Sequence, residues 1–122
     1  MRFMMLVKAA ENTPPVPELY RAIGQLAQEM AQKGTLLDMG GLAPSTQGTR
    51  IRLAKSKLTT TDGPFTEAKE LVGGFAVLSA SSRDEALELG RRFMQVHADI
   101  LGPDHVVELE IRQIVDPPTR PE

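Results

Sequence analysis

Carboxylates gather in the segment TTTDGPFTEAKELVGGF, residues 59–75, around a turn-forming Asp-Gly-Pro. Asp62 opens the turn, and Glu67 and Glu70 follow within a short charged stretch. Carboxylates that lie close together raise one another's pKa, which lets identical groups act as an acid and a base. We therefore interpret Asp62 as a candidate proton-transfer residue that lines a small polar pocket. The candidate ligand-binding residues around it are Thr61, Gly63, Phe65, Glu67 and Lys69.

A purely structural interpretation of the same segment stays open. An Asp-Gly pair forms turns in many proteins, because the aspartate side chain can bond its own backbone two residues on. Lys69 can neutralise the neighbouring glutamates, which would leave a solvated charged turn. Phe65 and Phe75 fit the core, because aromatic residues make up only 4% of the chain and a small domain needs them inside. We expect Gly63 to adopt a positive φ in the turn.

The remaining polar residues give weaker signals. His97 and His105 are eight residues apart, which is not the i, i+4 spacing of a helical metal site, so we expect no metal. Gly73-Gly74 lacks the lysine of a phosphate-binding loop, and we expect no cofactor. It suits a β-bulge. Arg50, Arg52 and Arg112 are compatible with an anion-binding wall or with exposed ion pairs, and Tyr20 with the cap of a pocket or with packing.

Composition restricts the class of protein. The 122 residues predict one domain, residues 1–115, followed by a flexible tail, residues 116–122. A net charge of −2 with scattered basic residues argues against a nucleic-acid surface. The chain has no cysteine, which excludes disulfides and thiol catalysis. The N-terminal apolar run is too short for a signal peptide and no window suits a membrane span, so we expect a cytoplasmic protein without membrane contact.

Hydrophobic periodicity predicts six strands and two helices. An apolar run at 3–7 and a second at 75–80 are typical of buried strands. A helical stripe begins at Pro17 and ends at Gly34, and another follows the capping sequence at Ser82 and ends at Gly102. Strands are predicted at 35–42 and 107–111, and a hairpin pairs 50–53 with 58–61 around a tip at 54–57.

This order predicts an α+β, ferredoxin-like sandwich: a βαβ unit, a β-hairpin and a second βαβ unit. Both helices then lie on one face of an antiparallel sheet. The runs at 3–7 and 75–80 are too continuously apolar to leave their other face in water. A second copy of the chain is the simplest cover, so we expect a homodimer that forms a dimeric α+β barrel through the sheet face.

The chain resembles the YCII-related family, in the subgroup named for its Asp-Gly-Pro-Phe motif. Nearly the whole chain carries the resemblance, with its most specific block at residues 61–70 and further matches at 2–4, 34–36, 40–44, 73–75, 84–86 and 110–112. The resemblance implies a dimeric ferredoxin-like fold. It implies no particular reaction, because family members often lack an assigned reaction. The genes of some members lie near sigma-factor genes.

One departure from the family pattern means that the family's histidine-aspartate chemistry cannot be transferred to this chain. Related YCII proteins carry a histidine early in the first helix, which is taken with an aspartate as a catalytic pair. Here that helix begins Pro17-Glu18-Leu19-Tyr20 and holds no histidine.

Two functions remain: a cofactor-free enzyme that uses Asp62 in a cleft near the dimer interface, or a module that binds a small molecule or regulates sigma-factor-dependent transcription.

Overall fold

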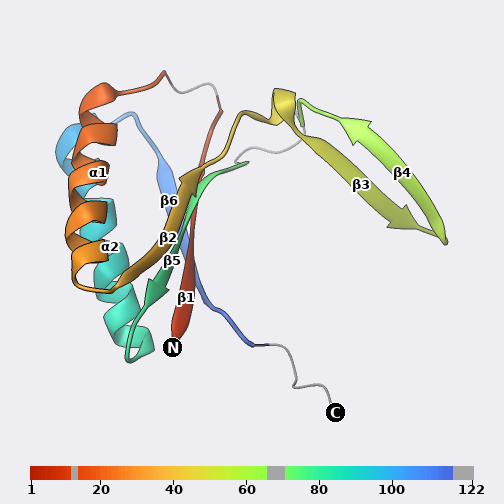
Figure 1. The fold of residues 1–122 in the computed structure, drawn as a ribbon. Helices are drawn as coiled ribbons and strands as arrows, with labels where there is room; N and C mark the ends of the chain where they lie inside the picture. The colour runs from red at the N-terminus through yellow and green to blue at the C-terminus, as the bar shows by residue number, and fades with distance from the viewer. Residues whose placement is uncertain (12–13, 66–70, 117–122) are drawn as a thin grey trace, which may run out of the picture.

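The computed structural model describes residues 1–11, 14–65 and 71–116. An antiparallel four-stranded sheet carries both helices on one face (Figure 1). Its strands are β1 (Arg2–Ala9), β2 (Leu36–Gly41), β5 (Leu71–Ser79) and β6 (Val107–Gln113), in the order β2-β5-β1-β6. The helices are α1 (Pro17–Gln32) and α2 (Arg83–Ile100). This is the ferredoxin-like α+β plan that the sequence predicts.

Local signals define α1 at both ends. Pro17 takes the first helical position, where its missing N–H costs no hydrogen bond. The helix ends before Gly34, whose φ of +76° is a conformation that glycine adopts without strain. Leu26 and Met30 are buried against the sheet, as the apolar stripe predicts.

The start of α2 differs in one detail from the expected capping box. Ser82 accepts a hydrogen bond from the amide of Glu85 at 3.1 Å, as predicted. The Glu85 carboxylate reaches the amide and hydroxyl of Ser81 instead of the amide of Ser82. These bonds, the hydroxyl's first, hold the pKa of Glu85 below its usual value.

The core lies between the sheet and the helices. Met5 and Leu78 from adjacent strands are almost fully buried, and Phe93 of α2 covers them. Burial of one such side chain contributes about 1.5–3 kcal/mol. Gly90 lets α2 approach β6 closely, because an added Cβ would lie 2.5 Å from Cδ1 of Ile111.

An ion pair joins the two helices at their outer surface. Arg92 of α2 donates to Glu29 of α1 at 2.6 Å, and Lys33 donates to the same carboxylate at 3.2 Å. Arg92 first and then Lys33 lower the pKa of Glu29. Because all three side chains are exposed to solvent, these ion pairs contribute little to the stability of the fold.

Strands β3 (Thr49–Ala54) and β4 (Lys57–Asp62) form a separate two-stranded sheet, which we call the arm. The arm leaves the body on the side away from α1 and α2 (Figure 1). Its tip is Lys55-Ser56, and both residues have a positive φ, of 52° and 65°. This two-residue tip is shorter than the expected tip at 54–57. A short 3-10 turn, Ser45–Gln47, precedes the arm.

The expected bulge at Gly73-Gly74 is confirmed. Val7 pairs with Gly74 and Lys8 with Val72, which leaves Gly73 as the extra residue of β5. The charged stretch 66–70 and the expected tail from residue 117 onward lie outside the described residues. Within the described ranges, no helix combines the length and apolarity needed to cross a membrane.

Candidate functional site

The Asp-Gly-Pro corner is closed by a backbone contact between distant residues. Gly63 donates its N–H to the carbonyl of Gly48 at 2.9 Å, and Gly48 donates to the carbonyl of Ser45 at 2.9 Å. An added Cβ on Gly63 would lie 1.7 Å from the Ser45 carbonyl oxygen. The expectation of a positive φ at Gly63 is wrong, since among the described glycines only Gly34 has one. Glycine is required here for close approach instead.

Asp62 ends β4 in an exposed position. Thr49 donates its hydroxyl to Oδ1 of Asp62 at 3.0 Å across the arm. Thr61 is also exposed, and Gly63 is half-buried beside them. The other two candidate contacts, Glu67 and Lys69, lie outside the described residues. A polar pocket around Asp62 therefore stays a prediction.

The two aromatic residues of the segment are not core residues. Phe65 is half-buried, and the Arg50 guanidinium stacks over its ring at 3.8 Å from the centroid. Phe75 is half-buried beside Gly40, where an added Cβ would lie 2.9 Å from its ring. The aromatic side chains that fill the core are those of Phe3 and Phe93. The expectation that Phe65 and Phe75 would fill the core is therefore wrong.

Ser45 connects this corner to the rest of the domain. Its hydroxyl accepts a hydrogen bond from the Phe65 amide at 3.2 Å and donates to Glu11 at 2.5 Å. The Ser45 amide donates to the other oxygen of the same carboxylate at 2.5 Å. Glu11 follows the end of β1 and is a functional candidate that sequence reasoning missed. The corner and the end of β1 are thereby held as one unit.

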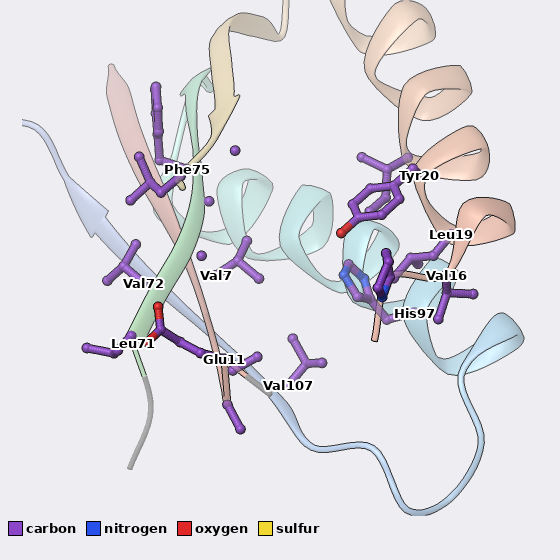
Figure 2. Close-up of a pocket in the computed structure, with 18 of the residues that line it drawn as sticks. Val7, Glu11, Val16, Leu19, Tyr20, Leu71, Val72, Phe75, His97 and Val107 are labelled. Carbon is purple, nitrogen blue, oxygen red and sulfur yellow. The ribbon is translucent and has the colours of Figure 1, made fainter. Parts of the chain in front are cut away.

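A cavity of about 500 Å³ lies between the helices and the sheet, and we call it the helix–sheet cavity. On the sheet side it is bounded by the C-terminal ends of β1 and β2 and by the start of β5. On the helical side it is bounded by the first turns of α1 and the last turns of α2. Most of its wall is apolar, with Val7, Leu19 and Val107 among its lining side chains (Figure 2). Glu11 also borders it, so the Asp-Gly-Pro corner is linked to the cavity through Ser45. Asp62 is not among the lining residues.

His97 supplies the cavity with a buried imidazole ring. His97 is only 6% exposed, and its ring packs edge-on against the ring of Phe93, with 4.7 Å between the two ring centroids. Nδ1 lies 3.0 Å from the Phe93 carbonyl oxygen, which can only accept, so Nδ1 carries the proton. In the neutral ring Nε2 is then an acceptor. Figure 2 places this ring and the Tyr20 hydroxyl on the helical side of the cavity.

The position of His97 in the helical pattern of α2 indicates a buried residue, although the spacing between the two histidines does not. The buried residues of α2 are Ala86, Gly90, Phe93 and His97, at intervals of four, three and four. A histidine on the buried stripe of a helix must face the core or a cavity. His105 also borders the cavity, from the loop before β6. Among the described residues, no three His, Asp or Glu side chains are grouped to hold a metal.

The opposite face of the sheet carries apolar residues flanked by charges. Met4 and Leu6 of β1 pair with Val77 and Phe75 of β5, and these four half-buried residues form what we call the open sheet face. Lys8 and Arg112 both donate to Glu110 at its border. Lys8 first and then Arg112 lower the pKa of Glu110, whose hydrogen bond in turn raises the pKa of Lys8. Arg112 thus belongs to an ion pair on β6, apart from Arg50 and Arg52 on the arm.

A family model confirms the class of protein that this fold suggests. The YCII-related domain matches residues 1–110, so the chain belongs to the YCII-related family. The chain is also 31% identical over 71 residues to an uncharacterized protein of Rhizobium meliloti (strain 1021). That match covers 58% of this chain and 57% of the relative, so it spans little more than half of the curated relative's length.

Proposed function

We propose that this YCII-related protein binds a small, largely apolar molecule in the helix–sheet cavity, with His97 as the acceptor for a hydrogen-bond donor on that molecule. The observation that carries the proposal is a buried histidine with one ring nitrogen engaged by Phe93 and the other available in a cavity of ligand size. Binding sites for small molecules are typically mostly apolar, of about 300–1,000 Å³, with few polar groups.

The polar groups narrow the class of ligand. Nε2 of neutral His97 accepts a hydrogen bond, so it favours an O–H or N–H on the ligand over an ether or a hydrocarbon. Tyr20 can donate to or accept from a second polar atom. The surrounding aliphatic side chains favour a compact aromatic or branched aliphatic body. A phenol is the simplest molecule that combines these features.

Phenol is expected to bind more tightly than anisole, which has the same ring but no donor. The expected preference is about fivefold to tenfold, because one hydrogen bond to a buried acceptor contributes about 1 kcal/mol. In His97→Phe the preference should vanish while anisole still binds, since the ring and its packing remain. Calorimetric titration of both compounds into both proteins measures this. Equal affinity for the two compounds in the unmodified protein would contradict the proposal.

A cofactor-free enzyme that uses Asp62 for proton transfer is the second candidate. Its support is the exposed Asp62 carboxylate, which accepts one hydrogen bond from Thr49 and stays open to solvent. The corner that carries Asp62 is also joined to the cavity wall through Ser45 and Glu11. Thr61, Gly63, Phe65, Glu67 and Lys69 are the proposed ligand contacts in this case.

Asp62→Asn tests the second candidate, because it keeps the shape of the side chain and removes its charge. If Asp62 acts on a ligand, the variant folds and self-associates normally but loses binding to ligands that stabilise the unmodified protein in a thermal-shift screen. Asp84→Asn, which makes the same change at an exposed carboxylate in the first turn of α2, is the matched control. A lower melting temperature with intact binding would instead identify Asp62 as a turn residue that Thr49 holds in place.

We further propose that two chains pair through the open sheet face and form a dimeric α+β barrel. The support is the apolar character of Met4, Leu6, Phe75 and Val77, which the helices of the same chain do not cover. Charges of both signs border this face, with Lys8 and Arg112 beside Glu108 and Glu110, so a symmetric copy meets complementary groups. The helix–sheet cavity lies between the sheet and the helices, and Phe75 borders both the cavity and the open sheet face.

A further inference from the structure

The arm has one apolar face and one polar face. Its register pairs Ile51 with Thr60 and Leu53 with Leu58, and paired residues share a face of the ribbon. The apolar face therefore holds Ile51, Leu53, Leu58 and Thr60, with the Thr49–Asp62 pair on the same face at the base of the arm. The opposite face holds Arg50, Arg52, Thr59 and Thr61, with Arg50 seated on the Phe65 ring.

The apolar face of the arm has no cover among the residues that the structure describes. Ile51, Leu53 and Leu58 are each about 70% exposed, and every residue of β3 and β4 is exposed. An isolated two-stranded hairpin is at best marginally stable in water, because it has no core of its own. Clustered exposed aliphatic side chains on a projecting element are typical of a protein contact.

The direction and length of the arm indicate what it meets. It leaves the body on the side opposite the helices, which is the side that the open sheet face looks toward (Figure 1). Six residues per strand give a reach of about 20 Å, whereas two sheets packed face to face lie about 10 Å apart. A second copy on the open sheet face therefore falls within reach of the arm.

Charge also favours a second copy. The arm, residues 49–62, holds four of the 14 basic residues of the chain, Arg50, Arg52, Lys55 and Lys57, and one acidic residue, Asp62. The other residues hold 10 basic against 15 acidic side chains, a balance of −5. A cationic arm and an acidic body attract each other between copies of the same chain.

We propose that the apolar face of the arm packs on the body of a second copy of this chain, so that each protomer of the dimer clasps the other. This inference rests on the proposed pairing through the open sheet face and adds a second contact to it. Because the interface is symmetric, two arms contribute. The exposed leucines then become buried residues of the dimer.

The double variant Leu53→Thr/Leu58→Thr tests the clasp. Threonine keeps strand propensity and removes apolar surface, so the hairpin persists. We expect the dimer dissociation constant from sedimentation equilibrium to rise at least about tenfold. The control Thr59→Ser/Thr61→Ser alters the polar face of the same strand and should change it by less than about twofold.

Photo-crosslinking gives a second measurement that needs no disruption of the arm. The chain has no cysteine, so a benzophenone probe on Leu53→Cys reports from one position. The expected product has twice the chain mass of 13.3 kDa, in higher yield than from Thr59→Cys. Equal dissociation constants for the leucine variant and its control, or crosslinks only within one chain, would overturn the clasp while the sheet-face dimer stands. A monomeric unmodified protein would overturn both.

Discussion

Gly63→Ala is expected to lower the free energy of unfolding by about 2–3 kcal/mol, in the range for an added methyl group in a closely packed site. The methyl group would lie 1.7 Å from the carbonyl oxygen of Ser45 and 2.7 Å from its carbonyl carbon. Both atoms are backbone, so no side-chain rotation relieves the contact. The corner has to open, which separates Phe65 and Glu11 from Ser45.

Gly73→Ala is the matched control for this effect. Gly73 lies in the bulge of β5, where an added Cβ meets nothing within 4 Å and φ is not positive. Its free energy of unfolding should stay within about 0.5 kcal/mol of the unmodified protein, as at ordinary surface positions. Urea denaturation of the three proteins measures both values. Equal midpoints for Gly63→Ala and Gly73→Ala would show that the Ser45 contact is not required.

The elements that the sequence predicts well are those with local signals. The stripe that begins at Pro17 and the glycine at 34 define α1 within the chain's own neighbourhood, and the paired runs at 50–53 and 58–61 define the arm. Continuous apolar runs predict β1 and most of β5. The start of β5 at Leu71 was missed by four residues, because Gly73 and Gly74 weaken a strand pattern while the bulge accommodates them.

The site was less predictable because its contacts join distant residues. Gly63 was singled out correctly, but the reason is its approach to Ser45, 18 positions earlier, which no turn pattern reveals. Glu11 bonds Ser45 across 34 positions and gave no signal of its own. His97 could have been found from its place on the buried stripe of α2. The motif thus predicted a structured corner, whereas the cavity emerged only from the packing of helices on the sheet.

The dimer proposal leads to the second large effect, at Val77. This residue lies at the centre of the open sheet face, paired with Met4 on β1 and with Asp38 on β2. Its side chain is half-buried in one chain and would be fully buried between two. In a symmetric pair, one substitution places a new group in both halves of the interface. The effect of a charge is therefore doubled.

Val77→Glu is expected to convert the dimer to a monomer, with a dissociation constant raised at least about a thousandfold. Each dimer would have to bury two uncompensated carboxylates in an apolar contact, and each costs several kcal/mol. In the separate chain, the same side chain can reach water at the sheet surface. Light scattering at micromolar concentration should give twice the chain mass for the unmodified protein and a single chain mass for the variant. Gln25→Glu places the same charge on the exposed side of α1 and should leave the dimer intact. If Val77→Glu remains dimeric while Gln25→Glu dissociates, the chains pair through the helical layer and not through the sheet.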